Sequence, residues 1–254
     1  MAILLSGDFH ANSKNELSLI SKHSLMGHFG IDTYQTIDYH VILGDGGFLW
    51  PNNQKGDAYN YEVLAYRPFP VLCVVGNHEP ILGRTDIPEV DMGLGETVYQ
   101  ISPLVSYLKR GKVYTIDGWR FLVLGGALSV DRAYRTPGKS WWAGEYWSEQ
   151  EKDDVFALLE REHSFDFVLS HTGPERINAL ACRDIMARSD KYGDEVALLN
   201  DEIDAKITCQ QWWCGHWHTD RYFYDETGKR GYQYLYNTVQ ILARENENRP
   251  LIIQ

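Results

Sequence analysis

Five short stretches of the sequence combine imidazole, carboxylate and amide side chains, and each follows an apolar run of the kind that forms a buried strand. They are Asp8-Phe9-His10, Gly44-Asp45, Gly76-Asn77-His78-Glu79, Ser170-His171 and Gly215-His216-Trp217-His218. Carboxylates, imidazoles and amides together form a ligand set for a hard or borderline divalent metal ion. Each stretch alone has an ordinary explanation, such as a turn-forming Asp or a buried His with satisfied ring nitrogens. The recurrence of the same pattern at five strand ends favours a shared metal site.

The first stretch illustrates how such a site forms. In an extended segment alternate side chains point the same way, so Asp8 and His10 can converge on one point. In the alternative reading, Asp8 caps a helix that begins near Ala11 and His10 is a loop residue. Taken alone, this stretch favours the alternative, and only the four later stretches favour convergence.

The elements around these stretches predict a parallel sheet. Apolar runs at residues 2–5, 40–43 and 71–75 each end at a glycine, and segments of helical character at 12–29 and 59–66 separate them. Continuous apolar runs that alternate with helices indicate parallel strands buried on both faces. Ligands of such sheets gather beyond the carboxyl ends of the strands. We therefore expect one rim to carry Asp8, His10, Asp45, Asn77 and His78.

The rest of the chain adds strands and helices to this pattern. Residues 80–111 are expected to be irregular, and residues 112–124 form the strongest hairpin signal, with Asp117-Gly118 at its turn. Ser148 and Glu151 predict a capping box that opens a helix to about residue 162. Strands are expected at 165–169 and 210–214, a second hairpin at 221–236, and short strands at 238–242 and 251–253. Residues 175–206 are expected to be helical with a polar break at 189–194.

Length and composition limit the class of protein. The chain has 254 residues, of which 44% are hydrophobic and 23% charged, and we expect residues 1–254 to form a single domain. A formal net charge of −11 lacks the electrostatic footprint of a general nucleic-acid binder. Cys73, Cys182, Cys209 and Cys214 form no CxxC pair and are expected to be free thiols in a reducing compartment. With no apolar stretch long enough to span a membrane, we expect a soluble cytoplasmic protein without a membrane partner.

The order of the five motifs, D-x-H, G-D, G-N-H-E, S-H and G-H-x-H, resembles the calcineurin-like metallophosphoesterase superfamily over nearly the whole chain, from Asp8 to His218. The resemblance implies an α/β fold, a four-layer α/β/β/α sandwich of two mixed sheets flanked by helices, with a two-metal site on the rim. It also implies that Asp8, His10, Asp45 and His218 bind the first metal. Asp45 bridges to the second metal, which Asn77, His171 and His216 complete. His78 stays off the metals and assists the leaving group.

The resemblance also implies a function. The chain is expected to be a dinuclear metal-dependent phosphoesterase. Its expected substrate is a small phosphomonoester or phosphodiester, with a nucleotide-like molecule as one candidate, and hydrolysis is by attack of a metal-bridged hydroxide. The donor set suits Mn, Fe, Zn, Ni or Co, with Mn favoured. One alternative is a nuclease, although the acidic balance argues against a long nucleic-acid partner. The other alternative is a non-catalytic metal-binding interaction module of the same fold. It is disfavoured because every expected ligand position is filled in this sequence. The sequence leaves the oligomeric state open.

One departure from the Ser/Thr protein phosphatase branch affects the catalytic histidine. That branch has the pattern G-D-x-x-D-R-G, whereas this chain has Phe48 and Leu49 at the positions of the second Asp and the Arg. The group that would orient His78 and the Arg that would grip phosphate are therefore missing there, although Glu79 matches the branch.

Substrate recognition has a weaker signal. The candidate substrate-binding residues are Arg132, Arg135 and Lys139, which are interleaved with Tyr134, Trp141 and Trp142. The alternative is a solvated basic loop packed by its own aromatics, and the two readings are about even. Residues 175–206 are a candidate helical lid, although an ordinary pair of layer helices is favoured. Asp220 is either a partner of a ligand histidine or a turn residue.

Overall fold

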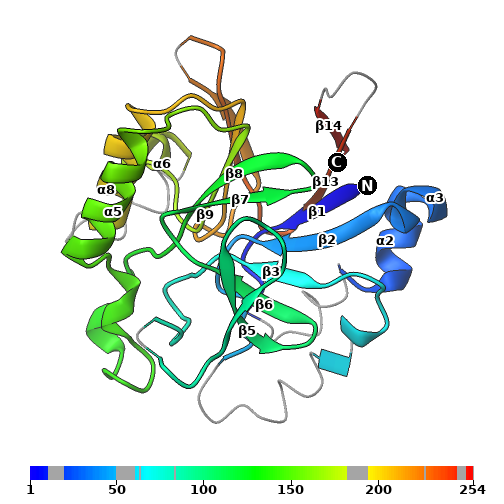
Figure 1. Ribbon diagram of the computed structural model, residues 1–254, viewed down its shortest axis with the longest axis horizontal. Helices are drawn as coiled ribbons and strands as arrows, with labels where there is room; N and C mark the ends of the chain where they lie inside the picture. The colour runs from blue at the N-terminus through cyan, green and yellow to red at the C-terminus, as the bar shows by residue number, and fades with distance from the viewer. Residues whose placement is uncertain are drawn as a thin grey trace.

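Two β-sheets form the centre of the protein, and helices cover their outer faces (Figure 1). The structure is a computed structural model and describes residues 1–10, 20–49, 61–62, 64–82, 84–181, 194–225, 227–244 and 250–253. Helices α5 (Glu149–Leu159), α6 (Glu175–Ala181) and α8 (Glu195–Asp204) lie on one side of the sheets. Helices α2 (Lys22–Phe29) and α3 (Ile31–Gln35) lie on the other side.

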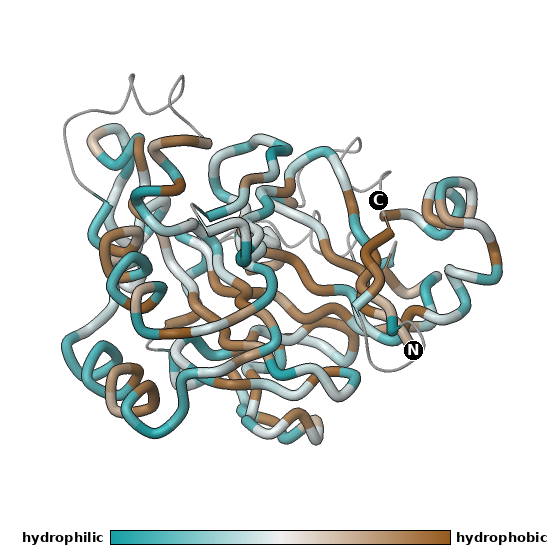
Figure 2. The backbone as a smooth tube through the Cα atoms, turned by 90° about the horizontal axis from the view of Figure 1, so that it is seen from above, coloured by the Kyte–Doolittle hydropathy of each residue, from teal (hydrophilic) through white to brown (hydrophobic). Residues whose placement is uncertain are grey.

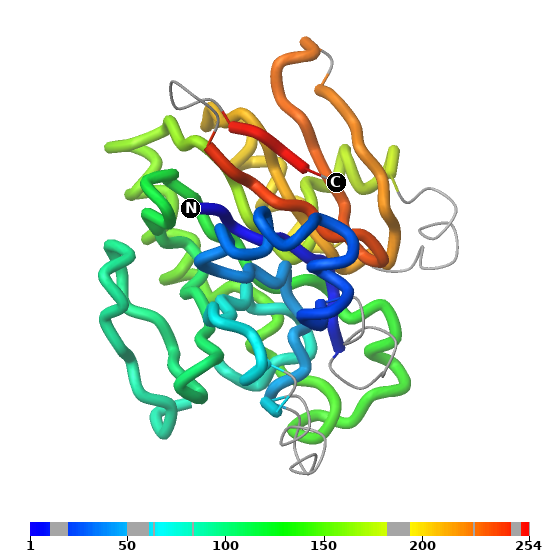
Figure 3. Tube along the Cα trace, turned by 90° about the vertical axis from the view of Figure 1, so that its right-hand side faces the viewer, coloured from blue at the N-terminus to red at the C-terminus, as the bar shows by residue number. Residues whose placement is uncertain are grey.

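The first sheet has eight strands in the order β14-β13-β1-β2-β3-β6-β5-β4. Its centre consists of four parallel strands, and the outer strands pair antiparallel. The parallel strands are β1 (Ala2–Ser6), β2 (Ile37–Ile42), β3 (Val71–Cys73) and β6 (Val105–Leu108), and the outer strands are β4 (Glu89–Asp91), β5 (Thr97–Ser102), β13 (Val239–Arg244) and β14 (Pro250–Ile253). The late strand β13 lies directly beside the first strand, so the two ends of the chain meet in one sheet (Figure 3).

The second sheet has six strands in the order β11-β12-β10-β9-β8-β7. They are β7 (Lys112–Ile116), β8 (Trp119–Leu124), β9 (Phe167–Ser170), β10 (Gln211–Cys214), β11 (Arg221–Tyr224) and β12 (Gly231–Tyr234). Strands β8, β9, β10 and β12 run parallel, whereas β7 and β11 close the edges as antiparallel hairpin partners. The predicted sandwich of two mixed sheets flanked by helices is confirmed.

Alternation along the strands produces the layers. In β1, Ile3 and Leu5 face the second sheet, where they share a buried cluster with Phe167 and Trp213. Ala2 and Leu4 face the opposite way and pack with the helices α2 and α3. Because both faces are covered, the strand is apolar throughout, which is why the sequence shows a continuous run. The tube coloured by hydropathy shows these apolar segments concentrated in the interior (Figure 2).

The helix boundaries follow the local capping signals. Ser148 accepts a hydrogen bond from the backbone N of Glu151, and the Glu151 side chain accepts from the backbone N of Ser148, which confirms the predicted capping box of α5. Helix α2 begins after Ser21 and ends at Gly30, whose φ is 83°. Gly27 lies inside this helix. The earlier part of the expected helix, at 12–19, lies outside the described residues.

The expectation that residues 80–111 are irregular was wrong, because β4, β5 and β6 lie there. Strand β6 continues the parallel core by pairing with β3, and its four residues are all buried. Its short length and the surrounding Gly and Pro residues conceal it in the sequence, since the pairing partner that stabilises it is distant along the chain.

Three of the four cysteines belong to the described residues. Cys73 and Cys209 are free thiols, Sγ of Cys214 donates to the carbonyl O of Gln233 at 3.7 Å, and Cys182 lies outside the described residues. Helices α6 and α8 contribute Ile177, Val196 and Ile203 to a cluster on the outer face of the second sheet. Of the predicted polar break at 189–194, the structure describes only Asp194, which caps α8, so the helical lid stays a prediction. Among the described residues, no helix combines the length and apolar character needed to cross a bilayer.

Candidate metal centre

Loops at the carboxyl ends of strands from both sheets bring the five sequence motifs to one place. Asp8 and His10 follow β1, Asp45 follows β2, and Asn77 and His78 follow β3. From the second sheet, His171 follows β9, whereas His216 and His218 follow β10. Among the described residues, five that are not glycine have positive φ, and four of them belong to this group: His10, Asp45, His216 and His218. Such strained backbone is uncommon and concentrates at functional sites.

Asp8, His10 and His218 form one potential metal-binding group, with ligand atoms within 4.8 Å of one another. Nε2 of His10 lies 3.1 Å from Nε2 of His218, and Asp8 Oδ2 lies 3.2 Å from the same atom of His218. Asp8 Oδ2 is buried, yet it accepts no hydrogen bond of good geometry from the described residues. Two ring nitrogens and an orphaned carboxylate oxygen that face each other suit a shared cation.

Asp45 lies at the centre of the site. Its Oδ2 is 3.4 Å from Nε2 of His171 and 3.6 Å from Nε2 of His78, and its Oδ1 accepts a hydrogen bond from the backbone N of His78 at 2.9 Å. Its backbone O accepts from the backbone N of His10 at 2.7 Å, which ties the first two motifs together. Burial raises the pKa of Asp45, but the charges of His171 and His78 outweigh burial and hold that pKa well below its usual range.

His171 is oriented for binding through Nε2. Its Nδ1 donates a hydrogen bond to the carbonyl O of Leu43 at 2.8 Å, which leaves Nε2 facing the acceptor Oδ1 of Asn77 at 2.9 Å. Burial lowers the pKa of His171, but the charges of Asp45 and Asp8 raise it to about 10. In the absence of a cation, a proton on Nε2 therefore faces two acceptors, Oδ1 of Asn77 and Oδ2 of Asp45 at 3.4 Å. This is the position that a metal ion would take, with Nδ1 held by a backbone carbonyl in the usual manner.

His216 completes this side of the cluster. Its backbone N donates to Asp8 Oδ1 at 2.5 Å, and its ring centroid lies 5.0 Å from that of His171. Burial and the neighbouring His171 lower the pKa of His216 to about 3. The ring is therefore neutral, which is the form that binds metal.

The glycines in the motifs are explained by close approach. A Cβ at Gly76 would overlap Oδ1 of Asp45, and one at Gly215 would overlap Oδ1 of Asp8. A Cβ at Gly44 would overlap the His171 ring. Each glycine therefore makes room for a proposed ligand from another strand.

Glu79 connects two of the loops. Its buried carboxylate accepts hydrogen bonds from the backbone N–H groups of Gly46, Gly76 and Asp45, and from the hydroxyl of Tyr107 at 3.2 Å. Burial and the charge of Asp45 raise the pKa of Glu79 to about 8. Glu79, which matches the protein phosphatase branch, thus holds together the loops after β2 and β3.

A hydrogen-bonded relay behind Asn77 was not expected from the sequence. Nδ2 of Asn77 donates to Oγ of Ser129 at 3.0 Å, and the Ser129 hydroxyl donates to Oε2 of the buried Glu145 at 2.6 Å. Glu145 lies in the short helix η2 (Ala143–Glu145). The relay fixes the amide so that Oδ1 points to the metal centre. Ser129 and Glu145 carry no motif, and only the spatial contact identifies them.

A guanidinium reaches His78 from a distant loop. Arg135 follows the short helix η1 (Arg132–Tyr134), and its NH1 and NH2 lie 2.6 Å and 3.2 Å from the two ring nitrogens of His78. Arg135 also donates to the carbonyl O of Ser140 at 3.0 Å and pairs with Asp131. Burial and Arg135 lower the pKa of His78 more than Asp45 raises it.

The other two candidate substrate-binding residues are placed differently. Arg132 stacks on Trp141, with 4.3 Å between its Cζ and the ring centroid, and donates to the Tyr146 hydroxyl at 2.9 Å. Lys139 is exposed. Of the three, the structure brings only Arg135 against a motif residue, and a substrate-binding role stays a prediction for each.

Phe48 and Leu49 stand where the protein phosphatase branch has Asp and Arg, and they are part of an apolar cluster. Phe48 is buried and Leu49 packs against the same cluster. These positions therefore contribute to the core beside β2, and Arg135 is the guanidinium near His78.

Comparisons with known proteins concern the family and the fold. The sequence profile of the calcineurin-like phosphoesterase family matches residues 1–220. A dimetal phosphatase from Danio rerio is similar in structure, with a TM-score of 0.56 and 11% identity over 99% of this chain and 95% of that chain. A phosphopantetheinyl hydrolase from Mycobacterium tuberculosis has a TM-score of 0.39 and 14% identity over 93% of this chain and 90% of its own. The search of curated proteins found no match.

The close approach at Gly76 yields a first prediction. Gly76→Ala should displace Asp45 and lower both thermal stability and the number of metal ions bound per chain, measured by elemental analysis after dialysis. Gly27→Ala is the control, because a Cβ there meets no described atom within 4 Å. That variant should gain about 0.5–1 kcal/mol from helix propensity and keep its metal. Wild-type metal content in Gly76→Ala would contradict the placement of Asp45.

The relay behind Asn77 yields a second prediction. Ser129→Ala should weaken the binding of one of two metal ions by roughly 10- to 100-fold, because the Asn77 amide loses its fixed orientation. Isothermal titration of the metal-free protein with Mn²⁺ measures this. Ser21→Ala removes a hydroxyl that caps α2, so it should cost about 1 kcal/mol of stability without changing metal affinity. Equal affinities in the two variants would exclude the relay.

Proposed function

The chain belongs to the calcineurin-like phosphoesterase family, and from this premise we propose that it is a dinuclear metal-dependent phosphoesterase acting on a small phosphomonoester or phosphodiester. The observation that carries the proposal is the convergence of six motif side chains around two buried carboxylates, Asp8 and Asp45. Oxygen and nitrogen donors of this kind, with one carboxylate oxygen left without a hydrogen bond, fit two divalent ions.

The proposed ligands divide into two sets that share Asp45. The first set is Asp8, His10 and His218, and the second is Asn77, His171 and His216. When bound, the ions would supply Lewis acidity and a water molecule whose pKa is lowered toward neutrality. Two contacts would keep the second set in place. They are the hydrogen bond from the ring Nδ1 of His171 to the carbonyl O of Leu43 and the relay behind Asn77. Mn²⁺ is the favoured ion, with Fe, Zn, Ni and Co as alternatives.

His78 and Arg135 would act on the ester itself. We assign His78 to the oxygen of the leaving group, as a proton donor or as a positive stabiliser. Arg135 is adjacent to His78 and is supported from behind by Asp131, so its guanidinium would contact the phosphoryl oxygens of a substrate in this position. The chain thus offers a guanidinium for phosphate even though the local motif position holds Leu49.

The charge of the chain favours a small substrate over a long nucleic acid. A net charge of −11 would repel a phosphodiester backbone beyond the immediate site. A small phosphorylated molecule, of which a nucleotide is one candidate, needs only the local positive charge of the ions and Arg135. The non-catalytic alternative is less well supported, because His78 and every proposed ligand are present in one cluster.

The proposal is tested with metal and substrate together. Metal-free protein should hydrolyse an aryl phosphate or a bis-aryl phosphate only after addition of Mn²⁺, Fe²⁺, Zn²⁺, Ni²⁺ or Co²⁺, and nucleotides, cyclic nucleotides and dinucleotides then define the substrate. Asp45→Ala should lose metal. His78→Ala should keep two ions and lose roughly 10²- to 10⁴-fold in kcat, with exposed His163 mutated to Ala as the control.

Two outcomes would change this proposal. Protein that binds metal but turns over neither ester would favour the non-catalytic alternative. His78 also forms a potential metal-binding group with His10 and Asp45, so its role needs a separate check. Loss of an ion in His78→Ala would make His78 a ligand rather than a catalytic group.

Arg135 provides a further test of the site. Arg135→Ala should raise KM for the phosphate ester by roughly 10- to 100-fold, since a hydrogen bond to a charged group is lost. Arg84→Ala is the control, because Arg84 is an exposed arginine that pairs with Asp86. A KM unchanged in Arg135→Ala but raised in Arg132→Ala or Lys139→Ala would move the phosphate contact to those residues.

A further inference from the structure

His218 is the most exposed of the proposed metal ligands. Its side chain is 46% exposed, whereas those of His10 and Asp8 are 22% and 1% exposed. Its backbone has a positive φ of 48°. A ligand this exposed needs another contact to hold its ring, since close packing is not available to fix its rotamer.

That contact is the ring of Tyr236. The two rings stack with their centroids 4.4 Å apart and an interplanar angle of 3°. Tyr236 lies in the segment that connects β12 to β13, in which Asn237 and Thr238 are exposed. The position of the His218 ring therefore depends on where this connecting segment lies.

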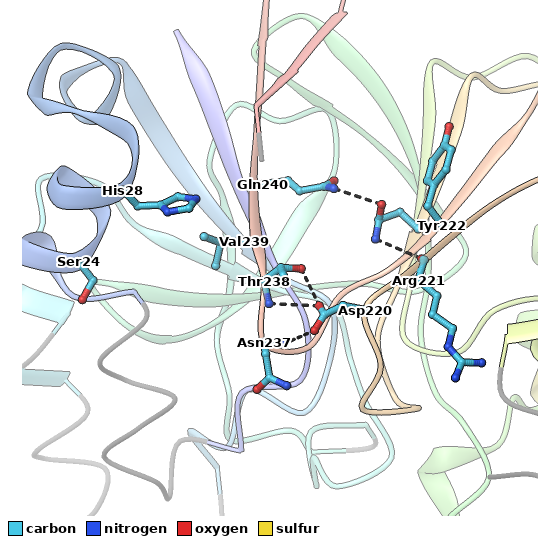
Figure 4. Close-up of a pocket in the computed structure, with 10 residues that line it drawn as sticks. Ser24, His28, Asp220, Arg221, Tyr222, Asn237, Thr238, Val239 and Gln240 are labelled. Atoms are coloured by element: carbon cyan, nitrogen blue, oxygen red, sulfur yellow. Dashed lines mark hydrogen bonds between the residues drawn. The ribbon is translucent and has the colours of Figure 1, made fainter. Parts of the chain in front are cut away.

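A cavity lies beside the connecting segment. Its volume is about 570 Å³, and its lining includes Asn237 and Thr238 as well as Ser24 and His28 of α2 (Figure 4). Because open space rather than packed side chains adjoins the segment on this side, packing alone does not fix it. Hydrogen bonds are left to do so.

Asp220 supplies those hydrogen bonds. Its carboxylate accepts from the backbone N of Tyr236 at 2.8 Å, of Asn237 at 3.0 Å and of Thr238 at 3.1 Å, and from the Thr238 hydroxyl at 2.6 Å. Figure 4 shows the carboxylate directed at Asn237 and Thr238. Asp220 is two residues beyond His218, so the same short stretch carries the ligand and holds the residue that stacks on it.

We propose that Asp220 and Tyr236 are positioning residues for His218: Asp220 fixes the connecting segment, and the Tyr236 ring fixes the imidazole for metal binding. The inference rests on the proposed function, because it takes His218 as a ligand. It differs from the two sequence interpretations of Asp220, since the carboxylate makes no hydrogen bond to the histidine in the described contacts and acts through a backbone segment and a ring.

Asp225 provides a matched control. It accepts hydrogen bonds from the backbone N of Thr227 at 3.1 Å, the Thr227 hydroxyl at 2.9 Å and the backbone N of Lys229 at 2.9 Å. It therefore holds a turn in the same way as Asp220. This turn joins the end of β11 to the start of β12, whereas His218 lies near the start of β11 and the end of β12. Loss of Asp225 should reproduce the structural cost without the link to a ligand.

The experiment titrates metal-free protein with Mn²⁺ alone by calorimetry and records thermal unfolding of each variant. Asp220→Ala and Tyr236→Ala should weaken one of the two binding events on the order of 10-fold or more. Tyr236→Phe keeps the ring and should retain the wild-type affinity. Asp225→Ala should lose about as much stability as Asp220→Ala and retain both affinities.

The outcomes separate this inference from the proposed function. If His218→Ala weakens one event but Asp220→Ala and Tyr236→Ala bind like wild type, the positioning role is wrong and the metal site stands. If His218→Ala has wild-type affinity, the ligand assignment itself fails. Should Asp220→Ala not fold, the comparison of Tyr236→Ala with Tyr236→Phe decides, and equal weakening in both would overturn the role of the stacked ring.

Discussion

The burial of Asp8 and Asp45 at the ends of neighbouring parallel strands is the constraint on which the site depends. Removing a carboxylate from water is costly unless positive charge and hydrogen bonds compensate it. Here the backbone N–H groups of His216 and His78 donate to the two carboxylates, and the pKa of His171 rises to about 10 because it faces both. Divalent cations would compensate the same charges more fully. Of the imidazoles around the two acids, His171 thus contributes positive charge at this point.

Bringing charged groups together requires the backbones to approach closely, and this explains much of the surrounding sequence. Gly76 and Gly215 leave space for the carboxylates, and Glu79 gathers the loops after β2 and β3 by accepting their N–H groups. A single buried carboxylate can hold two loops only if both present donors to it. The polar and glycine residues at the strand ends are therefore a connected set in which ligands and supports depend on each other.

The sequence was sufficient for the residues that carry their own signal and insufficient for those defined by long-range contact. The motif residues recur after apolar runs, so a shared rim was predictable from the residues, whereas the two-sheet fold was predicted from the family resemblance. Strand β6 was missed because its stability comes from pairing with β3. Ser129 and Glu145 look like ordinary loop residues, and their role depends on the position of Asn77 in space. Arg135 could not be separated from Arg132, because only the fold directs one to His78 and the other to Trp141.

The loop that carries Arg135 is joined to the metal centre at its other end. Arg110 donates to the carbonyl O of Gly144 and of Tyr146 at 3.0 Å and 2.6 Å, and Glu145 between them closes the relay to Asn77. One end of this loop thus supports a proposed metal ligand, while the other presents a guanidinium beside His78. Lys139, which lies between the two anchors, is exposed. The proposed phosphate contact and the support of a proposed ligand therefore lie in one loop, so a shift of this loop would disturb both.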